Sequence, residues 1–209
     1  MRTTVITKEI QNSITPTSII TDLLEGNKRF TEAKKETVDY LAQVAQTVEG
    51  QFPKAVILSC IDSRVPVEII FDQSIGDIFV ARVAGNFENI DILGSMEYSC
   101  KVAGSKLILV LGHESCGAVK AACDGVELGN ITEMLSKIMP AVKLSAGQVN
   151  GETNSSNKDL VAKTVANNVL LTIDRIREKS PVLKEMENNG EIKIVGGVYH
   201  LSTGKVELI

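Results

Sequence analysis

Two stretches of the chain have the same sequence pattern, and the first of them is PKAVILSCIDSR at residues 53–64. The second is KLILVLGHESCG at residues 106–117. Each starts with an apolar run of strand length, as expected of a strand that is covered on both faces. Each run then ends abruptly in small and polar residues. In an open parallel α/β sheet, binding sites form where the carboxyl ends of neighbouring strands meet.

The polar residues at these two ends are types that bind metal ions. Cys60 and Asp62 follow the first run, and His113 and Cys116 follow the second. Two thiolates and one imidazole make a Cys₂His set, which suits a catalytic zinc that keeps a fourth position for water, and thiolates favour zinc over hard cations. Asp62 leaves two alternatives open. It either closes the site as a fourth ligand, or pairs with Arg64 and accepts a hydrogen bond from a zinc-bound hydroxide.

Outside these stretches, apolar strand-like runs alternate with amphipathic helical segments. The expected strands are residues 55–60, 77–86, 106–112 and 191–201, with an edge strand at 204–209. The expected helices between them are residues 89–104, 114–126, 129–146 with a break at Pro140, and 160–180. This alternation predicts an α/β fold in which a mostly parallel central sheet of four strands, plus a C-terminal edge strand, is flanked by helices. No repeat or long linker divides the chain, so we expect a single domain over residues 1–209.

The first fifty residues predict a helical arm. Residues 1–16 have no clean hydrophobic period, whereas residues 18–30, with Thr17 as a possible N-cap, and residues 37–51 have apolar side chains at helical spacing. Two amphipathic helices before the first strand need a surface to cover. We expect part of this arm, residues 1–50, to pack on a partner subunit.

Composition excludes several classes of protein. The net charge of −4 and the lack of a Lys/Arg cluster argue against a nucleic-acid partner. No apolar run is long enough to cross a membrane, and the N-terminus lacks an apolar signal core, so we expect a cytoplasmic protein. The four cysteines do not suggest a disulfide scaffold. Cys100 and Cys123 lie in apolar helical stretches, and we expect them to be buried packing residues.

The two motifs also carry a family resemblance. CIDSR followed by GHESCG resembles the β-class carbonic anhydrases, whose pattern is Cys-x-Asp-x-Arg with a later His-x-x-Cys. The similarity extends from about Gln51 to Gly125. By this resemblance the Cys₂His set binds Zn²⁺, and Asp62 and Arg64 form a catalytic dyad.

Further positions resemble the plant-type branch of that family. Another branch builds a regulatory bicarbonate site from Trp, Arg and Tyr, but this chain has no Trp and Ile57 stands at the Trp position. The resemblance implies a glutamine beside the zinc-bound oxygen and a partly apolar pocket for the substrate. The substrate-binding residues implied in this way are Gln51, Phe79, Ala84, Tyr98 and Gly117.

The resemblance implies reversible hydration of CO₂ to bicarbonate and a proton, by attack of a zinc-bound hydroxide that the Asp–Arg dyad orients. It also implies a homodimer or homotetramer in which a second subunit contributes some pocket residues. Two alternatives stay open. One is a hydrolase of the same fold that acts on carbonyl sulfide or carbon disulfide. The other is a non-catalytic, zinc-stabilised binding protein in which Asp62 permanently closes the metal site.

Overall fold

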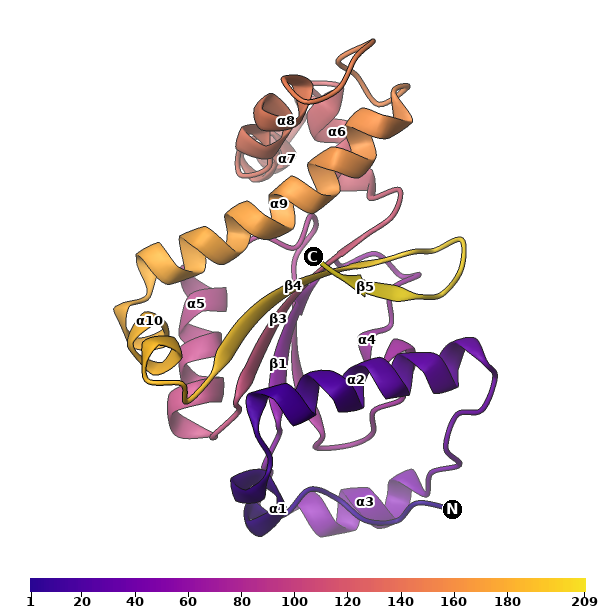
Figure 1. Cartoon of the computed structure of the whole chain (residues 1–209), viewed down its shortest axis with the longest axis vertical. Helices are drawn as coiled ribbons and strands as arrows, with labels where there is room; N and C mark the ends of the chain where they lie inside the picture. The colour runs from indigo at the N-terminus through magenta and orange to yellow at the C-terminus, as the bar shows by residue number, and fades with distance from the viewer.

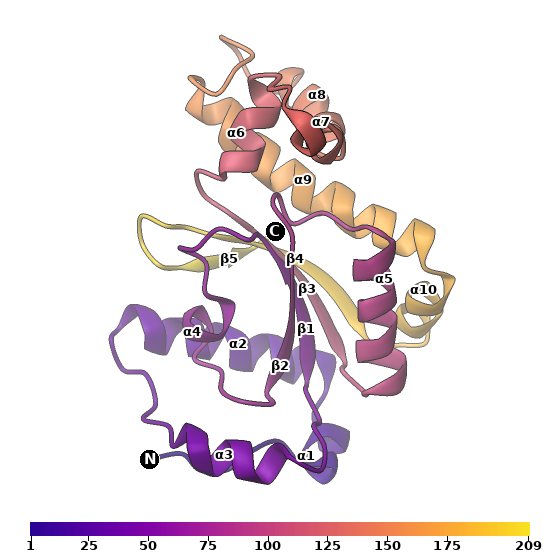
Figure 2. The same cartoon turned by 180° about the vertical axis from the view of Figure 1, so that it is seen from behind.

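The computed structural model describes residues 1–209 and shows a five-stranded sheet between two layers of helices (Figures 1 and 2). The strand order is β2-β1-β3-β4-β5. The first four strands run parallel and β5 is antiparallel to β4, which confirms the predicted sheet. The strands are β1 (Ala55–Ser59), β2 (Ile78–Arg82), β3 (Leu107–His113), β4 (Lys193–Tyr199) and β5 (Val206–Leu208).

The order of the strands places a topological switch point between β1 and β3. From β1 the chain crosses to β2 on one side, and β3 then lies on the other side of β1. Ser59, the last residue of β1, pairs with Leu111, two residues before His113. Since ligands of such sheets bind at the carboxyl ends of strands beside the switch point, the residues that follow β1 and β3 occupy the expected position for a site.

One face of the sheet is covered by α5 (Ile90–Glu97), α9 (Lys158–Lys179) and α10 (Pro181–Asn188) (Figures 1 and 2). Side chains alternate along a strand, and Val56 and Leu58 of β1 point into this layer. The helix predicted at residues 89–104 is α-helical only in its first part. Its last part is a π-helical turn, η1 (Tyr98–Val102).

The other face is covered by α2 (Pro16–Thr31) and α4 (Val67–Ile70), against which Ala55 and Ile57 of β1 pack. The cap of α2 is Thr15 rather than Thr17, since the Thr15 hydroxyl accepts from the Ser18 amide in a capping box. Because Ile19 and Leu23 of α2 pack in this layer, the apolar stripe of α2 is covered by its own chain.

The remaining N-terminal elements are α1 (Lys8–Ser13) and α3 (Tyr40–Thr47), which lie together beyond the amino end of the sheet (Figure 1). The helix α1 falls where the sequence shows no period. It is tied down by the buried Gln11, whose amide donates to the carbonyls of Pro53 and Ala103. Packing of this arm on a partner subunit stays a prediction.

A third group of helices covers the carboxyl end of the sheet: α6 (Gly117–Cys123), α7 (Gly129–Ser136) and α8 (Met139–Ala146). The break predicted in the helical segment 129–146 is confirmed: it separates α7 from α8, and Pro140 lies in the first turn of α8, just after it. Cys100 and Cys123 are buried and free, as expected. None of the helices combines the length and the apolar character that crossing a bilayer requires.

Candidate metal centre

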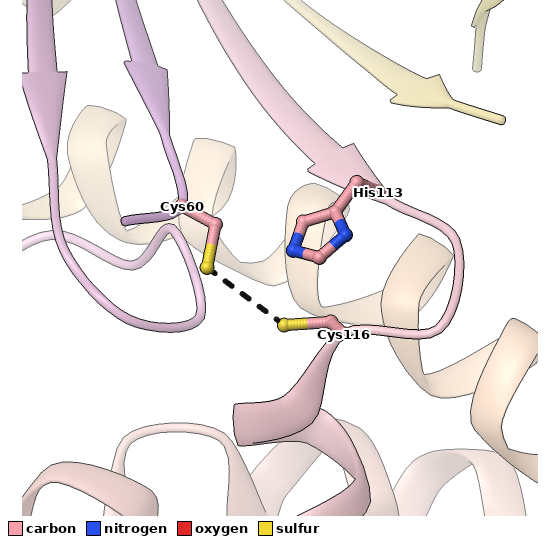
Figure 3. A group of neighbouring side chains, drawn as sticks. All are labelled: Cys60, His113 and Cys116. Atoms are coloured by element: carbon pink, nitrogen blue, oxygen red, sulfur yellow. Dashed lines mark hydrogen bonds between the residues drawn. The ribbon is translucent and has the colours of Figure 1, made fainter. Parts of the chain in front are cut away.

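Cys60, His113 and Cys116 converge from two strand ends and one helix start (Figure 3). Cys60 directly follows β1, His113 is the last residue of β3, and Cys116 is the N-cap of α6. All three are buried, and their ligand atoms lie within 4.8 Å of one another. The two sulfur atoms are 4.0 Å apart.

The His113 ring is oriented so that one nitrogen faces the two thiols. Its Nδ1 lies 3.0 Å from the Glu114 carbonyl oxygen, which can only accept, so Nδ1 carries a proton and donates it. Its Nε2 is buried without any hydrogen-bond partner. A buried polar atom rarely stays unpartnered, and a backbone acceptor on one ring nitrogen is the usual support for an imidazole that binds a metal through the other.

The donor set fits a zinc ion. A tetrahedral zinc with Zn–S bonds of about 2.3 Å holds its two sulfurs about 3.8 Å apart. The observed separation of 4.0 Å is close to that value. The Cys60–Cys116 contact lowers the pKa of the Cys60 thiol and raises that of Cys116, because the pair shares one proton between two sulfurs. The pair therefore loses its first proton readily and its second one with difficulty.

A single residue in the left-handed region makes the second ligand turn tight enough to bring two ligands together. Ser115, between His113 and Cys116, has a φ of 55°. This conformation reverses the chain within two residues, which lets a strand end and a helix start face the same point. A non-glycine residue with positive φ is uncommon and is held in place only by surrounding structure.

Asp62 and Arg64 form a bidentate pair beside this group. Arg64 donates to the Asp62 carboxylate from Nε at 3.0 Å, from Nη2 at 2.7 Å and from its backbone N–H at 2.9 Å. The side-chain contact with Arg64 is the main reason that the pKa of Asp62 falls to about 2. Asp62 Oδ2 lies 3.9 Å from His113 Nε2, at the border of the Cys–His–Cys group.

Two anchors that the motifs did not reveal hold the first ligand turn. Arg82, at the end of β2, donates from Nε to the Cys60 carbonyl at 2.8 Å and from Nη2 to the Asp62 carbonyl at 2.7 Å. The Gly85 amide donates to Cys60 Sγ at 3.4 Å. The register of β1 against β2, which pairs Ser59 with Arg82, is the signal for the first anchor, and it is visible only in the sheet.

The predicted substrate residues do not all meet at this site within one chain. Ala84 precedes the Gly85 anchor, and Gly117 follows Cys116, where it is exposed. Gln51 lies before β1, at the strand end opposite Cys60. Phe79 pairs with Val56, and at a rise of about 3.3 Å per residue this pair is about 13 Å from Cys60 along the strand.

Phe79 and Tyr98 instead share a hollow along the β2 edge. Their rings meet edge to face with centroids 6.3 Å apart. β2 is the first strand in the sheet order, so one side of it has no neighbouring strand. The structure therefore separates the predicted site residues into a group at the carboxyl end of the sheet and a group on its β2 edge.

The fold and the Cys–His–Cys group define an α/β protein whose site suits a catalytic metal ion. The model of the carbonic anhydrase family matches residues 55–206, which include every ligand candidate. The chain is 37% identical over 195 residues to carbonic anhydrase 2 of Mycobacterium tuberculosis, with 89% of each chain covered. It is 34% identical over 192 residues to a carbonic anhydrase of Mycolicibacterium smegmatis, again with 89% of each covered.

Solved structures agree with the sequence matches. The β-carbonic anhydrase CcaA has a TM-score of 0.71 at 25% identity, with 91% of this chain and 94% of that chain covered. The Coccomyxa β-carbonic anhydrase has a TM-score of 0.70 at 28% identity, with 91% and 86% covered. This chain belongs to the β-class carbonic anhydrase family, a family of enzymes whose general reaction is the hydration of CO₂.

Proposed function

We propose that this chain catalyses the reversible hydration of CO₂ to bicarbonate and a proton, with Zn²⁺ held by Cys60, His113 and Cys116. The observation that carries the proposal is the convergence of these three ligand atoms within 4.8 Å. Three protein ligands rather than four leave a position for substrate water. When bound in such a set, zinc makes water acidic enough to supply a nucleophile near neutral pH.

Asp62 orients the attacking oxygen. Its pKa of about 2 keeps the carboxylate ionised at neutral pH, so it acts as a hydrogen-bond acceptor rather than as a store for a proton. Arg64 fixes both carboxylate oxygens, and Oδ2 is the one that lies on the His113 side. This pair supports a catalytic site over a structural one, because a carboxylate tied to a guanidinium in two places has few lone pairs left for a fourth metal bond.

A second copy of the chain completes the pocket in this proposal. Gln51 and Phe79 lie too far along β1 and β2 to reach the metal group of their own chain, and the Tyr98 ring packs against Phe79. Ala84 and Gly117 contribute from the same chain as the metal. In the completed pocket the aromatic side chains exclude water around CO₂, and Gln51 donates a hydrogen bond to bicarbonate.

Exposed apolar side chains support association into a homodimer or homotetramer. Ile90, which lines the hollow beside the free side of β2, is exposed, and so is Val102 at the end of η1. The helix α3 presents a further exposed stripe of Leu41, Val44 and Val48. Apolar side chains gathered beside an unpaired strand edge are typical of interfaces between chains. Solved relatives of the same fold from Sordaria macrospora are described as tetrameric β-carbonic anhydrases.

The test is stopped-flow CO₂ hydration by the zinc-loaded protein, followed with a pH indicator from mildly acidic to alkaline conditions. Activity throughout, rising smoothly with pH, is the expected result. Activity that appears steeply and only at alkaline pH would mean that Asp62 closes the metal site at neutral pH. A stoichiometric zinc content without any CO₂ hydration would refute the proposal, and faster turnover of carbonyl sulfide in competition would favour a hydrolase.

A further inference from the structure

The turn that follows β2 has an unusual backbone. Gly85 has a φ of 84° and Asn86 a φ of 44°, so two successive residues lie in the left-handed region. A side chain at Gly85 would be strained by this φ, and it would also force Ile138 to move, because a Cβ there would lie 2.5 Å from Ile138 Cδ1. Backbone of this kind persists only where surrounding contacts hold it.

Gly85 makes one hydrogen bond through its carbonyl oxygen and another through its amide N–H. Asn168, on α9, donates from Nδ2 to the Gly85 carbonyl oxygen at 2.8 Å. The Gly85 N–H donates to Cys60 Sγ at 3.4 Å. A helix residue 83 positions away is thus connected through one glycine to a sulfur of the metal group.

Burying the amide of Asn168 in the core destabilises the fold, which indicates that its contact with Gly85 has a role other than stability. Asn168 is 1% exposed, and its near neighbours on α9, Val165 and Val169, belong to the hydrophobic core. Its Oδ1 has no hydrogen-bond partner, so the amide is only half satisfied. An apolar residue would be the better choice for stability at such a position, since a buried polar atom without a partner is destabilising.

We infer that Asn168 is a positioning residue for the metal centre: by holding the Gly85 carbonyl it aims the Gly85 N–H at Cys60 Sγ. This inference rests on the proposed function. A hydrogen bond to a thiolate withdraws charge from the sulfur, so the sulfur donates less charge to its metal and the metal becomes the stronger Lewis acid. Contacts of this kind are known to tune metal sites from outside the ligand set.

The experiment compares Asn168→Leu with Asn167→Leu in the full-length protein loaded with Co²⁺. Asn167 is the matched control, because it is also buried on α9 but donates to Ser145 Oγ at 2.8 Å and to Gln148 Oε1 at 3.0 Å. The first readout is the near-ultraviolet charge-transfer band from sulfur to Co²⁺. The second is the Co²⁺ dissociation constant, measured by competition with a chelator.

Asn168→Leu should move the charge-transfer band to longer wavelength, because a sulfur without its hydrogen bond gives up an electron more easily. It should also weaken Co²⁺ binding by about tenfold, because the loss of a pre-positioned Cys60 outweighs the stronger charge donation by its sulfur. Asn167→Leu should keep the wild-type band. If Asn168→Leu does not fold, Asn168→Ser removes the amide with a smaller side chain and the same band is measured.

An unchanged band in the Asn168 variant, or an equal shift in the Asn167 variant, would overturn the inference while leaving the proposed function intact. A wild-type protein without any band from sulfur to Co²⁺ would overturn the thiolate metal site, and the inference with it. The wild-type spectrum therefore separates the two failures.

Discussion

The carboxyl end of the sheet and the β2 edge differ in how much of a site one chain builds. At the carboxyl end, the three candidate ligand side chains are buried, and the turn that carries Cys60 is anchored by Arg82 and by the Gly85 amide. At the β2 edge, Tyr98 is 54% exposed and the outer side of the strand is unpaired. The Cys–His–Cys group is complete in one chain, whereas the side chains at the β2 edge are only partly covered by their own chain.

The physical reason for this difference is that metal ligands and pocket walls have different geometric requirements. Ligands for a metal must lie within a few ångströms of one point, and the switch point between β1 and β3 brings them there inside one sheet. A pocket for CO₂ needs apolar walls and few polar groups. Such walls are also what an interface between two chains supplies, so this part of the site can be shared.

The largest effect is expected from Cys60→Ser, which breaks the carboxyl end and leaves the β2 edge unchanged. Without one thiolate the metal should be lost, and CO₂ hydration should fall by at least about 10³-fold, because no other group acidifies water. Metal content and stopped-flow rates measure both effects. Cys123→Ser is the control, since this buried cysteine lies outside the group and should keep its metal.

Asp62→Asn tests the oxygen acceptor without removing a ligand candidate. Zinc content should stay at the wild-type level, and kcat should fall by about 10²-fold, because an amide accepts a hydrogen bond less strongly than a carboxylate and can present its NH₂ group instead. The two quantities are measured on the same preparation. Full activity with zinc retained would remove the dyad from the mechanism.

Ile90→Lys tests the β2 edge and leaves the metal group intact. Ile90 is 80% exposed beside this edge, so a charge there should separate the copies. Loss of the second copy should lower kcat/KM by about 10- to 100-fold through misplacement of the substrate, with zinc unchanged. Sedimentation velocity and rates are compared with those of Leu128→Lys, which places a charge at an exposed residue before α7. A monomeric but fully active Ile90→Lys would contradict the shared pocket.

The smallest effect is the dependence of stability on pH in Arg64→Gln. The pKa of Asp62, about 2 in the folded protein, lies below the ordinary value of about 3.9. The pair therefore stabilises the fold fully above about pH 4, and this contribution is lost as the pH falls through about 2. Urea unfolding should show a small, constant deficit of the variant between about pH 5 and 8 that shrinks below about pH 4. A deficit that grows on acidification would contradict this assignment.

Local sequence predicted the strands and the Cys–His–Cys group because both depend on short spacings. A short, β-branched apolar run such as AVILS is typical of a strand that is buried on both faces, and β1 is that strand. His113 and Cys116 have two residues between them, and they converge because one turn joins them. The α/β class and the five-stranded sheet followed from the same alternation and are confirmed.

Features that depend on competing local contacts were predicted less well. Thr15 and Thr17 are equally able to cap, and Thr15 is chosen because Pro16 fits the first helical position and Ser18 returns the hydrogen bond. The π-helical turn at Tyr98–Val102 leaves no periodic signal. From the sequence alone these residues are predicted to continue the helix. In the structure they pack beside β1.

The sequence by itself determined the strand ends, the donor types and their spacing, since these follow from hydrophobic periodicity and ligand chemistry. Only the tertiary structure decided that Arg82 and Asn168 serve the Cys60 turn, because the contact partners are 22 and 83 residues apart and meet through strand pairing and helix packing. It also decided that Phe79 lies away from its own metal group, because the register of β2 against β1 pairs Phe79 with Val56. Register is a property of the folded sheet, and no local pattern carries it.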